Sequence, residues 1–143
     1  MNIARTLYII MSYPQRLRHR LGYGVQSPWA YELVRDVFFE RRYHYYAYEE
    51  QGIRKESARQ LWRIKNRFRT HLIVLDTDAQ EHYDRVASTA TNDTILLLEH
   101  IDDTNAPLWS HILHDERATV TFDLIHRGVV SFDRKRVKQN YIL

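Results

Sequence analysis

The chain has 143 residues, of which 44% are hydrophobic and 27% charged, and none is cysteine. This length and composition predict one folded domain and exclude the low-hydrophobicity, high-charge signature of disordered proteins. Without cysteine there are no disulfides, thiolate zinc sites or cysteine nucleophiles, and a cytoplasmic protein is expected. The apolar run from Leu7 to Met11 is too short for a secretory core or a membrane span, so we expect no membrane partner.

Charge is distributed unevenly along the chain, although the net charge is only +3. Residues 1–70 hold 14 Lys and Arg against 6 Asp and Glu, whereas residues 71–143 hold 7 against 12. An anionic partner for the basic half is one explanation. The explanations that we favour are a basic helical layer that packs beside an acidic one, or two copies that associate head to tail.

The first 70 residues are expected to be helical, because apolar side chains recur in them at helical spacing. The Tyr13-Pro14 step is expected to end the first helix, since the residue before a proline disfavours helical geometry. Ser27 followed by Pro28 is typical of the first residues of a helix, and the glycines before them permit a tight loop. The predicted helices cover residues 3–11, 14–21, 28–40 and 53–68.

Residues 71–143 alternate short apolar runs with helical segments, a pattern typical of an α/β fold. His126-Arg127-Gly128 is predicted as a hairpin turn, and Asp78 as a helix cap. We expect a mostly parallel sheet of about four strands with an antiparallel C-terminal strand pair, beside the basic helical layer of residues 1–70, in one domain over 1–143. Strands are predicted at 72–75, 95–98, 119–125, 129–132 and 139–142, and helices at 79–90 and 106–115.

Motifs at both ends of the chain resemble those of one protein family. They are Gly24-Val25-Gln26-Ser27-Pro28-Trp29, then Thr121-Phe122-Asp123-Leu124 with Gly128, and Lys138-Gln139. Similar motifs occur in a group of bacterial class I S-adenosylmethionine-dependent methyltransferase-like proteins. The element order after residue 71 is also similar to the second half of that fold, where the last strand inserts antiparallel beside its neighbour. The resemblance implies a truncated, partial Rossmann-like sheet.

The cofactor-binding part of that family has no counterpart in this sequence. In the family a glycine-rich turn after the first strand lets the backbone approach the cofactor, and the four glycines here form no such motif. Phe68 leads directly to a segment that resembles the family's fourth strand. Thr77 and Asp78 replace the family's glycine and histidine after Asp76, and Glu99-His100 replaces its paired aspartates. We therefore expect neither S-adenosylmethionine binding nor any other cofactor.

Acidic residues follow the first two predicted strands, at the edge where open α/β sheets place their ligands. One interpretation is a site for a hard cation or a small polar ligand, with Asp76 and His100 as a general acid/base pair. The other is that these carboxylates cap helices and meet water. No nucleophile accompanies them, so enzymatic activity is not expected. The candidate ligand-binding residues are Asp76, Asp78, Glu99, Asp102 and Asp103.

Two further patterns are weaker. His111 and His114 have a spacing that metal sites use, but eight scattered histidines produce such pairs by chance, so no metal site is expected. Arginines interleave with tyrosines in the basic half, as in proteins that bind single-stranded nucleic acid, yet acidic residues interrupt the patch. A nucleic-acid-binding module is therefore an alternative. Its candidate residues are Arg16, Arg18, Arg20, Arg41, Arg42, Arg59, Arg63 and Arg67.

The loss of three strands would leave the edge of the strand at 72–75 uncovered, and proteins normally cover such edges. The N-terminal helices or a second copy of the chain are the two candidates. The aromatic content of 13% and the charge asymmetry favour a homodimer. The leading hypothesis is thus a non-catalytic interaction or assembly protein. A nucleic-acid-binding module and a residual enzyme at the acidic edge are the alternatives.

Overall fold

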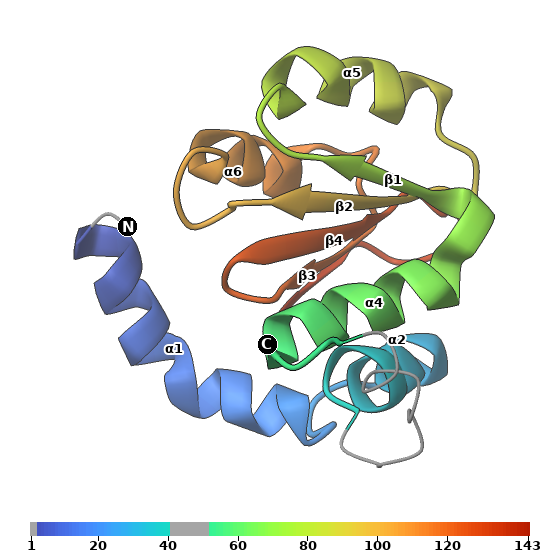
Figure 1. Cartoon of the computed structure of the whole chain (residues 1–143). Helices are drawn as coiled ribbons and strands as arrows, with labels where there is room; N and C mark the ends of the chain where they lie inside the picture. Colours follow the sequence, from blue (N-terminus) through green and yellow to red (C-terminus); the bar gives the residue numbers. More distant parts are fainter. Residues whose placement is uncertain (1–2, 41–51) are drawn as a thin grey trace. The chain divides into compact units, whose positions relative to one another are not determined.

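The computed structural model describes residues 3–40 and 52–143 (Figure 1). These residues fall into two compact units, one of residues up to Leu17 together with 71–143, and one of residues 18–70. The first helix therefore groups over most of its length with the sheet and not with the other helices. A single domain over the whole chain stays a prediction.

In the described part of the chain, five strands form one sheet in the order β1-β2-β4-β3-β5. β1 pairs in parallel with β2 and β3 with β5, whereas β4 is antiparallel to both β2 and β3. The α/β class is confirmed, but the expected mostly parallel sheet of about four strands is corrected to a mixed sheet. The strands are β1 (Leu72–Leu75), β2 (Ile95–Glu99), β3 (Val120–Asp123), β4 (Arg127–Ser131) and β5 (Gln139–Ile142).

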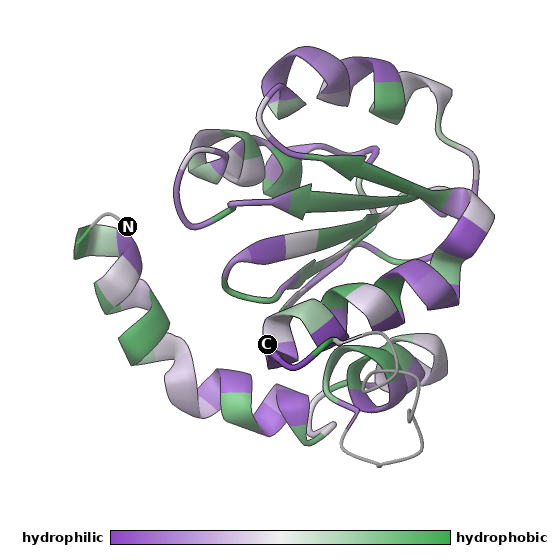
Figure 2. Cartoon of the chain, in the orientation of Figure 1, coloured by the Kyte–Doolittle hydropathy of each residue, from purple (hydrophilic) through white to green (hydrophobic). Residues whose placement is uncertain are grey.

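Helices α5 (Ala79–Thr89) and α6 (Ala106–His114) contribute the main apolar cluster of this unit. Leu96 and Leu98, alternate residues of β2, and Val130 of β4 join it, as expected of strands whose side chains point to opposite faces. Figure 2 shows β1 and β2 as mainly apolar. Trp109 packs directly on the backbone of β4. A Cβ atom on Gly128 would lie 2.3 Å from the indole ring, so glycine is required there.

The β3–β4 hairpin turns earlier than the sequence indicated. β4 already begins at Arg127, so the turn consists of residues 124–126 and the predicted turn at His126-Arg127-Gly128 is wrong. The Asp123 carboxylate accepts a hydrogen bond from the Ile125 backbone N–H at 2.9 Å, and Ile125 has a φ of 75°. This local bond from an aspartate to the backbone two residues on is what sets the turn.

Helix α1 (Ile3–Arg20) continues through Pro14, which corrects the two short helices predicted for this segment. Pro14 cannot donate a hydrogen bond to the carbonyl of Ile10, a loss that usually ends or kinks a helix. Two residues on, Arg16 Nε donates to Ser12 Oγ at 2.9 Å, and its guanidinium also donates to the carbonyl oxygens of Asp123 and Leu143. These contacts hold the turn around the proline in helical geometry.

The second unit begins with the last residues of α1 and continues through the predicted glycine loop. Gly22 has a φ of 91° and lies against the ring of Tyr31, and Ser27 accepts a hydrogen bond from Ala30 N at 3.4 Å, so the predicted helix start is confirmed. Helix α2 (Pro28–Glu32) passes into the π-helical η1 (Leu33–Phe38), α4 (Glu56–Phe68) follows, and the short 3-10 helix η2 (Arg69–His71) leads to β1.

Arg63 of α4 holds the end of η1. Its guanidinium is buried and donates to the carbonyl oxygens of Val37 and Phe38, and it also contacts Glu56 at 2.6 Å. The last carbonyls of a helix lack partners within the helix, so a buried arginine satisfies them. Among the described residues, no helix is both long and apolar enough to cross a membrane.

A polar network ties the C-terminal end of α6 to α5. Asp115 accepts hydrogen bonds from Arg117 Nη2 at 2.8 Å and from the Tyr83 hydroxyl at 3.0 Å, and Arg117 also bonds to Asp84 at 2.9 Å. The hydrogen bonds from Arg117 lower the pKa of Asp115 to about 2. Burial, and then the bond to Asp115, raise the pKa of Tyr83 above its ordinary value.

We expect Asp115→Asn to lower the melting temperature at pH 7 by about 4 °C, because it removes charge-assisted hydrogen bonds. The ordinary pKa of this group is 3.8, so its contribution to stability is complete above about pH 4 and is lost as the pH falls towards 2. The difference between the wild type and the variant should therefore shrink over that range, as measured by thermal unfolding at a series of pH values.

Asp84 provides the control, since it binds the same arginine but its side chain is 82% exposed. Asp84→Asn should change the melting temperature little at any pH. A difference between wild type and Asp115→Asn that persists at pH 2 would contradict the assignment of this contribution to the carboxylate.

Candidate functional site

Asn105 joins the C-terminal ends of β1 and β2. Its buried side-chain amide donates to the backbone oxygens of Asp76 and Glu99, each at 2.8 Å. The sequence analysis did not select this residue. Its place directly before Ala106 and Pro107 is typical of a helix cap, but its side chain makes no cap hydrogen bond. It bridges the strand ends instead, and so fixes the loops that carry the candidate acidic residues.

The structure brings Asp76 and His100 together at this edge. His100 Nε2 lies 3.3 Å from Asp76 Oδ1, and the two side chains are 57% and 51% exposed. His100 adopts a φ of 55°, an uncommon conformation for a residue with a side chain. Both side chains are more than half exposed, and within the described residues no third side chain orients the imidazole. This geometry is an exposed contact between an imidazole and a carboxylate, and it lacks the second partner that holds a general base in place.

The other acidic candidates are neutralised or face solvent. Glu99 pairs with Arg127 at 3.2 Å, and Asp102 pairs with His126 at 2.7 Å. Asp78 and Asp103 are exposed, and Asp78 begins α5 without the predicted side-chain cap bond. In the described parts of the chain, no group of three or more histidines and carboxylates is placed to hold a metal ion. The edge is therefore a series of separate pairs, which does not match a multidentate cation site.

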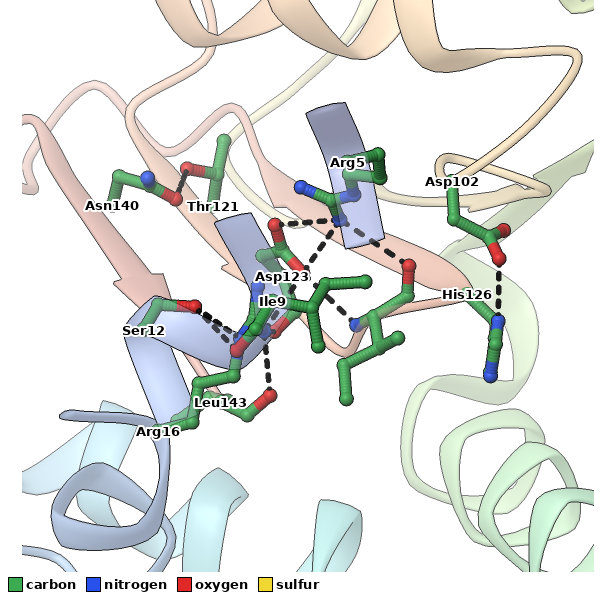
Figure 3. A network of polar contacts seen from close by, with 11 residues as sticks. Arg5, Ile9, Ser12, Arg16, Asp102, Thr121, Asp123, His126, Asn140 and Leu143 are labelled. Carbon is green, nitrogen blue, oxygen red and sulfur yellow. Dashed lines mark hydrogen bonds and ion pairs between the residues drawn. The ribbon is translucent and has the colours of Figure 1, made fainter. Parts of the chain in front are cut away.

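A buried ionic cluster that the sequence analysis missed lies at the end of β3 (Figure 3). Arg5 Nη2 lies 3.2 Å from Asp123 Oδ1 and 3.1 Å from Oδ2, and Arg16 Nη1 lies 3.1 Å from Oδ1. Arg16 is fully buried and also donates to the backbone oxygens of Asp123 and Leu143, at 3.3 and 2.8 Å. The cluster thus fastens α1 to the ends of β3 and β5.

This cluster is structural in its chemistry. Asp123 is 2% exposed, both of its carboxylate oxygens have partners, and no solvent-facing position is left beside it for a reacting group. The hydrophobic pattern of this helix predicts Arg5 and Arg16 on its solvent-exposed face, because apolar residues are expected to point inwards. The signal that could have identified them is the placement of Asp123 at the end of a fully buried strand, where an unpaired carboxylate would be costly.

Two arginines of the proposed nucleic-acid patch are buried. Arg16 and Arg63 are buried in separate intramolecular clusters, so neither is available to a phosphate group, and this corrects their assignment to the patch. Arg67 pairs with Glu32 at 3.5 Å, Arg59 bonds to the Ile53 carbonyl, and Arg20 lies over the Phe39 ring. Arg18 is exposed. Arg41, Arg42 and the interleaved tyrosines lie outside the described residues.

Comparisons with known proteins do not identify a family. No protein-family model, no curated protein and no solved structure matches this chain. The chemistry of its own residues therefore carries the functional conclusion.

We expect Asp123→Asn to destabilise the protein by about 3 kcal/mol, because a buried arginine then loses its countercharge while the side-chain volume stays almost unchanged. Chemical denaturation followed by circular dichroism measures this free energy of unfolding. Asp103→Asn, an exposed substitution at the same edge of the sheet, is the matched control and should change it by less than about 0.5 kcal/mol. Equal effects of the two substitutions would rule out the buried cluster as a main source of stability.

Proposed function

We propose that this chain is a non-catalytic, cytoplasmic interaction protein that assembles by pairing the edge of β1 with the β1 edge of a second copy. The observation that carries the proposal is the state of this strand. β1 is the end strand of the sheet and, among the described residues, pairs with β2 alone. Ile73 and Val74 are 37% and 44% exposed. A short apolar strand with a free row of backbone groups is a template for a further strand.

The opposite edge of the sheet differs in its side chains. β5 exposes Gln139 and Asn140, while Tyr141 and Ile142 are buried. Asn140 also accepts a hydrogen bond from Thr121 Oγ1 at 2.8 Å, which occupies its carbonyl within the sheet. The apolar edge is therefore β1, and this difference favours one defined mode of pairing over unlimited addition at both edges.

The sequence of β1 is complementary to itself when two copies run antiparallel. Directly opposite residues of an antiparallel pair lie on the same face of the sheet, so a two-fold axis passes through one residue of the strand. With the axis at Val74, this residue lies opposite Val74 of the second copy, and Ile73 lies opposite its Leu75. The new ladder is then apolar, and equal patches related by a two-fold axis form closed dimers.

The polar groups at the strand ends support a non-catalytic role, since they neutralise one another in pairs. The origin that we propose is a methyltransferase-like domain without the strands that hold the cofactor. In support of it, β4 lies antiparallel between β2 and β3, the insertion that the resemblance implies. Loss of three strands would also account for an apolar edge at β1.

We expect the wild-type protein to have twice the 17.3 kDa mass of one chain and Val74→Lys to be a monomer. A lysine at the centre of the ladder faces its copy across the two-fold axis, and like charges opposite each other oppose pairing. Size-exclusion chromatography with multi-angle light scattering, over a concentration series, measures the mass.

Val137→Lys is the matched control, because Val137 is 84% exposed and lies outside the strands. It should remain dimeric. A wild-type protein that stays monomeric at about 100 μM, or equal dissociation of the two variants, would contradict the proposed assembly.

A thermal-shift titration tests the non-catalytic part separately. A ligand that prefers the folded state raises the melting temperature, by an amount that grows with its concentration. We expect no shift with S-adenosylmethionine up to about 1 mM. A saturable shift with one molecule bound per chain would instead show a working cofactor site, and the protein should then be assayed as an enzyme.

A further inference from the structure

Helix α1 packs on the sheet through a polar face, and its apolar face points to solvent. Arg5, Ser12 and Arg16 lie on the face that points to Asp123, and the buried cluster fixes that face inwards (Figure 3). The opposite face carries apolar side chains out into solvent. Ile3 is 78% exposed, Leu7 53%, Ile10 62% and Met11 81%.

Five of the exposed apolar residues of α1 follow a regular spacing. These five, which do not include Met11, succeed one another at alternating intervals of four and three positions, so they lie on one stripe of the helix. This is the spacing of the seam along which two helices pack in a coiled coil. We name this set the α1 stripe, and its members are Ile3, Leu7, Ile10, Pro14 and Leu17.

The stripe cannot rotate inwards without a large cost. Such a rotation would expose Arg16, break its bonds to Leu143 and Asp123, and leave the carboxylate of Asp123 buried without a countercharge. The ionic cluster therefore holds the stripe outwards. Contiguous apolar surface of this kind marks a site of interaction in a soluble protein.

The charges around the stripe indicate what kind of partner it fits. Residues 1–31 contain no aspartate or glutamate, the exposed side chains of 3–17 are uncharged, and exposed Arg18 follows at the C-terminal end. Two copies of α1 would not satisfy Arg18. A parallel pair would bring one Arg18 beside the other, and an antiparallel pair would bring it to the positively polarised N-terminus of the second helix. A partner helix that carries carboxylates provides a countercharge for Arg18.

We propose that the α1 stripe docks an amphipathic helix of a partner protein, with apolar residues along its seam and acidic residues beside it. This surface is distinct from the β1 edge. The two interactions are independent, so one chain can pair with its copy through β1 and bind the acidic helix through α1.

A designed peptide serves as the probe. It has three heptads with Ile and Leu at the seam and Glu at the flanking positions, and a second peptide carries Lys in place of Glu. We expect fluorescence anisotropy with the full chain to show saturable binding of the acidic peptide, one per chain, and at least tenfold weaker binding of the lysine peptide. Ile10→Asp should weaken binding of the acidic peptide at least tenfold, and Arg18→Glu should reverse the preference between the two peptides.

Ala4→Asp is the matched control, since it places the same charge on an exposed position of α1 that is outside the stripe and 14 positions from Arg18. It should bind the acidic peptide within about twofold of wild type, as should the Val74→Lys chain, and circular dichroism should show all variants folded. Failure of the acidic peptide to bind, equal binding of both peptides, or binding that survives Ile10→Asp would overturn the proposal. A fall in the mass of the assembly with Ile10→Asp would also overturn it, because the occupant of the stripe would then be a second copy of the chain. Binding to phosphatidylglycerol vesicles that depends on Ile10, in place of peptide binding, would show that the stripe binds a lipid surface.

Discussion

The ion pairs between α1 and Asp123 are the constraint on which the rest of the described structure depends. Asp123 ends a fully buried strand, so its charge must be matched inside the protein, and Arg5 and Arg16 match it. The same carboxylate sets the β3–β4 turn through Ile125 N, and Arg16 also reaches Leu143 beyond β5. Asp123 thus determines the hairpin turn, the position of α1 on the sheet and the face of α1 that points to solvent.

Interaction surfaces in this protein follow from where its polar groups are satisfied internally. At the ends of β1 and β2, Asn105 takes up two backbone oxygens, and His100, Arg127 and His126 meet the acidic side chains. Among the described residues, the apolar surfaces that face solvent include the β1 edge and the α1 stripe. Both surfaces are suited to association by backbone pairing or side-chain packing, which need shape and register and do not need a reactive group.

Local sequence predicted the elements of the sheet unit well and their contacts poorly. β1 and β5 lie where the apolar runs placed them, and α5 and α6 end within one residue of expectation, because burial and helical periodicity are local signals. Pro14 was misread because the bonds that keep its helix intact come from residues more than 100 positions away. The acidic edge was found, since strand ends meet at one side of a sheet, but the basic partners that neutralise it lie on β4 and the hairpin. The sequence predicts Arg16 at the surface because Asp123 and Leu143, which hold its guanidinium inwards, are more than 100 positions away.

The ionic cluster that fastens α1 to the sheet joins residues that are synthesised far apart in time. Arg16 is separated from Asp123 by 107 positions and from Leu143 by 127. At about 5–20 residues per second, α1 therefore waits roughly 5–25 s between its own synthesis and that of its anchors. During that interval the charged face of α1 lacks Asp123, and its apolar stripe is already present. The newly made helix is thus open to chaperones, or to its docking partner, before the sheet exists to orient it.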